Sequence, residues 1–200
     1  MRQYDVKIIH CSLEDAHDFI DEYQEQQKGE NFLWIPGGGH IPEAAFGYVD
    51  AAQEMLQQAD ELGLTFDAVF LPCGTGTTQA GLIYGLRNQD IKVIGISIAR
   101  PVERCINEIK DTLNSMYEFD GLVSSNSPDI IVLDNMGIKY GDTDENIIEV
   151  SRQLAHTDGI FLDPIYNAKA FYGMKQYLED YDQLQKVLYV NTGGLPNIFM

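Results

Sequence analysis

The chain has 200 residues, enough for one domain with a sizeable core. Its hydrophobic fraction of 44% and its 18 glycines against 7 prolines are typical of a folded α/β protein and exclude general disorder. Charge is the extreme value: 13 Lys and Arg against 31 Asp and Glu leave −18, a field that repels phosphate backbones and anionic lipids. We therefore expect neither nucleic acid nor a membrane among the partners.

The cysteines and the N-terminal segment bear on compartment and metal content. Cys11, Cys73 and Cys105 are an odd number without Cys-x-x-Cys spacing, so we expect neither a disulfide framework nor a zinc site. Cys73 is expected to be a small buried filler. Met1–Asp5 has no apolar signal core, and no apolar run approaches the ~18 residues that span a bilayer. The prediction is a cytoplasmic protein without bound metal.

Strand-like apolar runs alternate with helical periods along the whole chain. The predicted strands are Asp5–His10, Phe32–Ile35, Ala68–Leu71, Val93–Ile98, Ile130–Leu133, Ile160–Leu162 and Val187–Val190. The predicted helices are Leu13–Gln27, Glu43–Leu62, Thr77–Leu86, Val102–Tyr117, Glu145–Ala155 and Ala168–Tyr181. This alternation predicts a single α/β domain over residues 1–200, with a doubly wound, mostly parallel sheet between two helical layers. In such a fold a ligand binds outside the carboxyl ends of the strands.

Glycine-rich stretches follow three of the predicted strands, and each taken alone is also explained as a tight turn. They are Pro36–Gly39, Cys73–Thr78 and Thr192–Gly194. The middle stretch is the most informative, because it lies between a buried strand and the first turn of a helix. Its candidate ligands are Gly74, Thr75, Gly76, Thr77 and Thr78. Turning amides, hydroxyls and a helix N-terminus together predict an anion cup sized for one phosphate.

The identity of the phosphate follows from what the loop lacks. It contains no lysine, so it is not a P-loop. A dinucleotide fingerprint needs a glycine where Gln79 stands and an acidic residue after the next strand, which Ile96–Arg100 does not supply. Arg100 is suited to a 2′-phosphate, so an NADP-binding Rossmann domain remains an alternative. A single phosphate monoester, such as that of pyridoxal phosphate, fits the loop better.

Four segments carry a resemblance to a known family. Gly74–Leu82 resembles the phosphate loop of fold-type II pyridoxal-phosphate enzymes, in particular the 1-aminocyclopropane-1-carboxylate deaminase/D-cysteine desulfhydrase family. Ile35–Gly39, Asp163–Ala170 and Asn191–Pro196 are similar to three further segments of that family, in the same order. The match runs from about residue 5 to the C-terminus. It implies the C-terminal, large-domain part of a tryptophan synthase beta-like enzyme.

The resemblance also implies roles for single residues. Tyr166 and Tyr140 are similar to the family's pocket tyrosines and are its candidate catalytic residues, whereas packing is the alternative for most of the 11 tyrosines. A phenol acts as acid or base only if nearby positive charge lowers its pKa. Asn167 stands where the family places a residue facing the pyridine nitrogen, commonly Glu or Thr. An amide there only hydrogen-bonds, which disfavours ring-opening deamination and is compatible with elimination.

Further expectations concern the cup, the pocket rim and the covalent anchor. Thr192 lies in the third glycine motif and is expected to contact the cofactor. His40, after the first motif, is expected at the surface, with the pocket rim as the alternative. In the family, the cofactor forms a Schiff base with a lysine in an N-terminal region that this chain lacks, and none of its eight lysines stands in that context. The chain is therefore expected to be incomplete relative to the family and inactive alone.

Two functions are compatible with the sequence, apart from the NADP alternative. The first is part of a pyridoxal-phosphate lyase or deaminase that acts on a small amino acid. The second is a non-catalytic pseudoenzyme that binds pyridoxal phosphate or another small phosphate ligand. Ala68–Leu71 and Val93–Ile98 are apolar enough for burial on both faces, and a missing layer would leave them as an exposed patch. We therefore expect a homo-oligomer, or a complex with a chain that supplies the N-terminal part.

Overall fold

The computed structural model describes residues 8–29, 35–98, 100–122, 128–134, 141–181, 184 and 186–199. The chain forms two compact units, Met1–Ile35 and Pro36–Met200. The first contains helix α1 (Leu13–Gln26), which begins after Ser12, whose hydroxyl accepts a hydrogen bond from the Asp15 amide at 3.1 Å. The strand predicted over Asp5–His10 is wrong for residues 8–10, because they pair with no described strand. The strand predicted over Phe32–Ile35 lies outside the described residues, except for Ile35, which is not in a strand.

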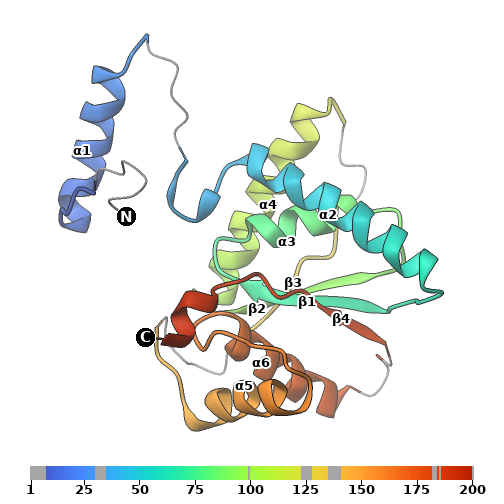
Figure 1. Ribbon diagram of the computed structural model, residues 1–200. Helices are drawn as coiled ribbons and strands as arrows, with labels where there is room; N and C mark the ends of the chain where they lie inside the picture. Colours follow the sequence, from blue (N-terminus) through green and yellow to red (C-terminus); the bar gives the residue numbers. More distant parts are fainter. Residues whose placement is uncertain are drawn as a thin grey trace. The chain divides into compact units, whose positions relative to one another are not determined.

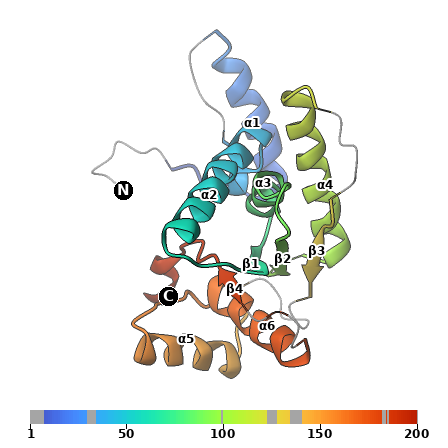
Figure 2. The ribbon, with the colours of Figure 1, turned by 90° about the vertical axis from the view of Figure 1, so that its right-hand side faces the viewer.

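The second unit is built on a four-stranded parallel sheet in the order β3-β2-β1-β4. Its strands are β1 (Ala68–Cys73), β2 (Lys92–Ser97), β3 (Ile131–Leu133) and β4 (Val187–Tyr189). Its helices are α2 (Pro42–Glu61), α3 (Thr77–Gly85), α4 (Val102–Phe119), α5 (Glu145–Thr157) and α6 (Asn167–Asp180). The short 3-10 segments are η2 (Gly37–Gly39) and η3 (Leu195–Phe199). Helices α2, α3 and α4 cover one face of the sheet, and α5 and α6 lie on the other (Figures 1 and 2). The predicted doubly wound α/β architecture is confirmed.

Both faces of the two central strands are covered by helices of this same chain. All six residues of β1 are buried, as are all residues of β2 except Lys92. Val69 and Leu71 belong to a core cluster with residues of α2, α3 and α4, whereas Phe70 packs in a second cluster with residues of α6. The exposed patch expected on these strands is therefore wrong, because the chain supplies both covering layers itself.

The segment Ile160–Leu162, predicted as a strand, forms none. Leu162 is buried and packs with residues of α5 and α6, whereas Ile160 and Phe161 are exposed. The carbonyl of Leu162 accepts a hydrogen bond from the Ser151 hydroxyl at 2.7 Å. Leu162 thus packs against helices, and the run does not pair in the sheet. No helix in the described part of the chain is both long and apolar enough to cross a membrane.

Small residues let α2 and α3 approach each other closely. A Cβ at Gly81 would lie 2.2 Å from the Ala45 carbonyl oxygen, and one at Gly85 would lie 2.6 Å from the Ala52 Cβ. Neither distance is possible for real atoms, so these positions accept only glycine while the helices keep this spacing. The contact fixes α3, and with it the position of the helix N-terminus that follows β1.

This packing predicts opposite effects for two glycine-to-alanine changes. Gly81→Ala should lower the free energy of unfolding by about 2 kcal/mol, because the new methyl group must push the helices apart. Gly47→Ala is the matched control, since Gly47 lies within α2 and its Cβ would meet no atom within 4 Å. That change should raise stability by up to about 1 kcal/mol through helix propensity. Chemical denaturation would measure both values, and equal effects would contradict the close packing.

Candidate functional site

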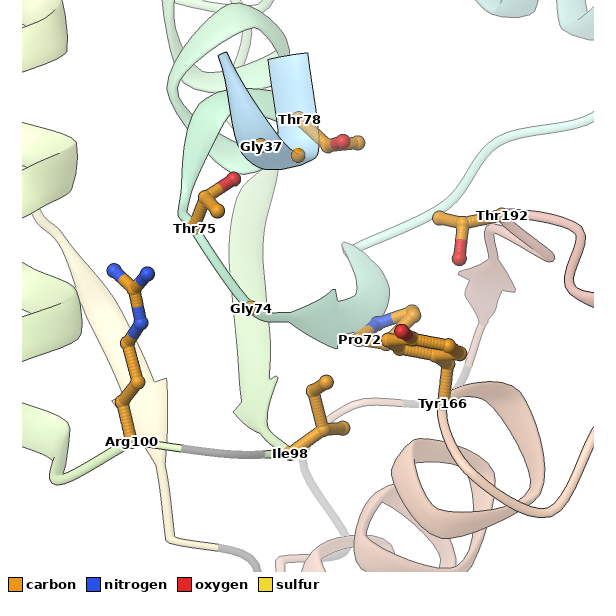
Figure 3. A pocket seen from close by; sticks show the side chains of 10 residues that line it. Gly37, Pro72, Gly74, Thr75, Thr78, Ile98, Arg100, Tyr166 and Thr192 are labelled. Atoms are coloured by element: carbon orange, nitrogen blue, oxygen red, sulfur yellow. The ribbon is translucent and has the colours of Figure 1, made fainter. Parts of the chain in front are cut away.

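A cavity of about 490 Å³ lies at the carboxyl ends of the strands. It sits where the strand order reverses, since the chain proceeds from β1 to β2 on one side and β4 lies on the other. Its lining residues are Gly37, Gly38, Pro72, Gly74, Thr75, Thr78, Ile98, Arg100, Tyr166 and Thr192 (Figure 3). All three glycine motifs of the sequence contribute to this one cavity.

Pro72 marks the point where β1 and β4 separate. The last hydrogen bond between the two strands runs from the Val190 amide, just after β4, to the Phe70 carbonyl of β1 at 2.8 Å. Backbone groups two residues apart in a strand face the same neighbouring strand, so the backbone of Pro72, like that of Phe70, faces β4. Proline has no N–H to donate, so the ladder cannot continue there. The paired register of β4 with β1 ends at Phe70 and Tyr189. Beyond this point the segments that follow β1 and β4 are free to diverge around the cavity.

The loop after β1 forms the predicted cup. Gly76 caps α3 in the left-handed conformation (φ +87°), and a Cβ there would lie 2.6 Å from Ile109 Cγ1. No side chain caps this helix, so its first amides have no intrahelical acceptor and remain available to an anion. Gly74, Thr75 and Thr78 line the cavity. The arrangement can therefore bind an anion without a lysine.

The first glycine motif packs against this cup. Gly38 has φ +74°, and a Cβ there would lie 2.7 Å from Thr75 Cγ2. Gly37 and Gly38 both line the cavity. This close approach explains the glycine at position 38, because a side chain there would displace Thr75.

On the other side of the cavity, the buried carboxylate of Asp163 organises the entry into α6. Its Oδ1 accepts hydrogen bonds from the amides of Ile165 (3.0 Å) and Tyr166 (2.8 Å). Its Oδ2 accepts from the Asn167 amide at 3.0 Å, and Asp163 is fully buried. Negative charge is also favourable at the N-terminus of α6. These bonds place Tyr166 at the cavity wall.

Asn167 connects the Asp163 turn to the third glycine motif. Its Nδ2 donates to Asp163 Oδ2 at 2.8 Å and to the Gly193 carbonyl at 2.6 Å. Its Oδ1 accepts from the Thr192 amide at 3.0 Å. The Tyr189 hydroxyl donates to the Asn167 carbonyl at 2.8 Å, and burial raises the pKa of Tyr189 well above 10. All amide atoms of Asn167 are thus bonded to protein, and the residue does not line the cavity.

The structure separates the predicted site residues into two groups. Gly74, Thr75, Thr78, Tyr166 and Thr192 line the cavity. Gly76, Thr77 and Asn167 are not on its wall and support it from behind. Tyr140 lies outside the described residues.

Sequence reasoning missed part of the wall. Pro72 and Ile98 line it, and Arg100 was considered only for a 2′-phosphate. Their position at or just beyond the carboxyl ends of neighbouring buried strands is the signal that could have located them. Arg100 is the one cationic side chain among the described lining residues, and it stands across the cavity from Tyr166, with Gly74 between them in Figure 3.

Two buried thiols lie behind the same loop. Cys73, at the end of β1, is almost completely buried, as predicted, and so is Cys105 of α4. A hydrogen bond with Cys73 lowers the pKa of Cys105 to about 6, and Arg100 acts in the same direction. The same contact and burial raise the pKa of Cys73. No cluster of three metal-ligating side chains occurs in the described part of the chain.

The sequence profile of a family described as "Pyridoxal-phosphate dependent enzyme" matches residues 1–193. The chain belongs to this family. It is 30% identical over 200 residues to a putative 1-aminocyclopropane-1-carboxylate deaminase of Pyrococcus furiosus, covering 99% of this chain and 60% of the relative. It is 31% identical over 195 residues to the 1-aminocyclopropane-1-carboxylate deaminase of Burkholderia vietnamiensis, covering 94% and 56%.

A crystal structure of a homologue of that deaminase superimposes with a TM-score of 0.79 at 30% identity. The superposition covers 96% of this chain and 57% of the other. The resemblance to the C-terminal part of a fold-type II pyridoxal-phosphate enzyme is therefore confirmed. The chain spans about 60% or less of the length of these relatives.

The residues at the cup fit the phosphate of pyridoxal phosphate. A Cβ at Gly74 would meet only Ile98 Cδ1, at 3.6 Å, so the cup is open on the cavity side and closed at Gly76. The free amides of α3 and the hydroxyls of Thr75 and Thr78 supply donors, and Arg100 supplies positive charge. The family's cofactor and this cavity are chemically compatible.

The Asp163 turn carries a stability prediction. Asp163→Asn should lower the free energy of unfolding by about 3 kcal/mol, because buried amides lose their acceptor and face a donor instead. Asp158→Asn is the control: Asp158 is exposed at the end of α5, and its replacement should change stability by less than about 0.5 kcal/mol. Urea denaturation measures both. An unchanged midpoint for Asp163→Asn would show that this carboxylate does not hold the turn.

Proposed function

We propose that this chain provides the cofactor-phosphate site and one wall of the substrate pocket of an amino-acid lyase or deaminase. The carrying observation is that the anion cup and Tyr166 line one cavity at the reversal point of the sheet. The similarity to 1-aminocyclopropane-1-carboxylate deaminases supports a small amino acid as the substrate. The acidic surface does not prevent this, since the cup is locally built from amides, hydroxyls and Arg100.

In this proposal, the cup binds the phosphate and so orients the whole cofactor. The free amides of α3 and the hydroxyls of Thr75 and Thr78 hold its oxygens. When bound, pyridoxal phosphate supplies an electron sink that eases loss of a proton or leaving group from the amino acid. The protein's part is to fix the ring relative to the groups on the opposite wall.

Tyr166 is the group that would move a proton. Its position is set by the Asp163 turn, and it stands across the cavity from Arg100 (Figure 3). A phenol takes part in acid–base work only where positive charge lies near it. Tyr140 remains a second candidate for the same task, and Thr192 a contact to the cofactor.

Asn167 bears on the type of reaction. The resemblance placed it at the pyridine nitrogen, but it lies off the cavity wall with its amide occupied by Asp163, Gly193 and Thr192. The described wall holds no carboxylate that would keep the pyridine nitrogen protonated. A weaker electron sink favours elimination of a good leaving group over opening of a cyclopropane ring. We therefore favour a β-elimination of the D-cysteine desulfhydrase type, which releases a keto acid and ammonia.

The covalent lysine anchor is proposed to come from outside the described residues. None of the described lysines lines the cavity. Lys169 follows Tyr166 on α6 but is buried, and burial lowers its pKa while the nearby charges of Asp142 and Asp144 raise it. Another polypeptide or a further segment would then complete the enzyme, in a homo-oligomer or a mixed complex in the cytoplasm. The same observation supports the second candidate, a non-catalytic protein that binds pyridoxal phosphate or another small phosphate ligand.

The cup predicts a selective loss of cofactor affinity. Gly74→Asp should weaken pyridoxal phosphate binding by about a hundredfold or more, because like charges ~4 Å apart repel by roughly 4 kcal/mol at an effective dielectric constant near 20. Gly74→Ala, whose Cβ has room beside Ile98, should bind nearly as the wild type does. Titration calorimetry compares the two. Equal affinity in both variants would remove the phosphate from this loop.

The absence of a lysine from the described wall predicts no turnover by the chain alone. The purified protein should release no keto acid from D-cysteine or from 1-aminocyclopropane-1-carboxylate. Borohydride reduction in the presence of pyridoxal phosphate should leave no pyridoxyl group at a specific lysine, as read by peptide mass spectrometry. Turnover together with one stoichiometrically labelled lysine would overturn the proposal of an external anchor.

A further inference from the structure

His40 connects the anion cup to helix α4 by two hydrogen bonds. Its Nδ1 lies 3.0 Å from Thr77 Oγ1, and its Nε2 lies 2.9 Å from Glu108 Oε2. The Thr77 hydroxyl lies in turn 3.2 Å from that of Thr75, which lines the cavity. His40 was expected at the surface, but it is half-buried. The result is one hydrogen-bonded chain that runs from Glu108 to the wall of the cup.

The chemistry of the end group sets the direction of this chain. An ionised carboxylate only accepts, so His40 Nε2 must carry the hydrogen that it shares with Glu108. In a neutral imidazole, Nδ1 is then an acceptor, and the Thr77 hydroxyl donates to it. Thr75 can donate to the oxygen of Thr77 in the same sense. Both threonine protons then point along the chain toward His40, and the oxygen of Thr75 faces the cup as an acceptor.

Protonation of His40 reverses the order. Nδ1 now donates to Thr77, whose own hydrogen is released toward Thr75. The hydrogen of Thr75 is then free to point into the cavity and to donate to an anion. The imidazolium also adds one positive charge behind a cup that has no lysine. Both changes favour a bound phosphate or sulfate.

We propose that His40, held by Glu108, is a positioning residue that makes the cup a stronger anion site when it takes up a proton. This inference rests on the proposed function, because it concerns the anion affinity of that same loop. Cofactor affinity would then depend on pH through a group that does not touch the cofactor. Histidine is suited to this role because its charge changes between about pH 5 and pH 8.

The other charged groups of the cluster affect the test differently. Glu108 also binds Arg100 at 3.4 Å and Arg104 at 3.6 Å, and both arginines keep their charge throughout this range. From α3, His40 and Thr75 both contact the hydroxyl of Thr77, which carries no charge. Among the described groups of this cluster, Cys105 also titrates in this range: its pKa is lowered to about 6, and its thiolate would repel an anion at higher pH. A Cys105→Ser background removes this contribution.

The experiment measures sulfate affinity by titration calorimetry on the 200-residue chain at about pH 5.5 and about pH 8. Sulfate is the probe because its own charge is constant over this range, unlike that of a phosphate monoester. In the Cys105→Ser background, affinity should fall by about tenfold between the lower and the higher pH, the effect of one charge-assisted hydrogen bond. His40→Gln, which cannot take up a proton, should abolish this dependence. Thr77→Val should reduce it, because this change removes the hydrogen-bond contribution and leaves the added charge of His40 in place.

His156→Gln is the matched control, since His156 is exposed in the last turn of α5 and has no part in the cluster. It should keep the full pH dependence, and circular dichroism verifies the fold of every variant. If sulfate binds but His40→Gln and Thr77→Val keep the tenfold change, the inference is overturned and the cup remains. If sulfate and pyridoxal phosphate fail to bind at either pH, the proposed function falls and the inference falls with it.

Discussion

The buried carboxylate of Asp163 holds together the half of the cavity that β4 and α6 form. It binds the amides that begin α6, and through the side chain of Asn167 it reaches Thr192 and Gly193. A buried carboxylate is tolerated only if hydrogen-bond donors surround it, so this turn has little freedom to rearrange. Gly194 belongs to the same arrangement, because a Cβ there would lie 2.8 Å from the carboxylate. Tyr166 and Thr192 are thereby fixed on a common wall.

The opposite half depends on backbone geometry instead of charge. Gly81 and Gly85 bring α3 against α2, and Gly76 turns the chain so that the helix amides face the cavity. An anion site made of amides and hydroxyls requires no lysine. In a chain of net charge −18, such a site depends on the local convergence of these donors with Arg100. The cavity opens between the two halves because β1 and β4 separate at Pro72.

Much of the fold could be predicted from the sequence, because the central strands are continuous apolar runs between helical periods. Ala68–Leu71 lies within β1 as expected, and Val93–Ile98 coincides with β2 except for its last residue, Ile98. Ile160–Leu162 failed because a short apolar run has the same pattern whether it pairs in a sheet or packs on helices. The glycine motifs located the cavity, but which loop residues face it depends on φ angles: Gly76 and Thr77 lie behind the wall, and Gly74 lies on it. The partnership of His40 with Glu108 spans 68 residues, and no local pattern announces such a contact.

The central claim is that the Gly74–Thr78 loop and Tyr166 form one site for pyridoxal phosphate. Amide chemical-shift mapping by NMR tests it most directly, with pyridoxal phosphate, unphosphorylated pyridoxal and inorganic phosphate titrated in parallel. Pyridoxal phosphate should shift the amides of Thr75, Thr78, Tyr166 and Thr192 saturably, and inorganic phosphate should shift only those of the loop. Pyridoxal alone should bind far more weakly. Saturable shifts confined to other parts of the chain, or identical shifts with pyridoxal and its phosphate, would contradict the account.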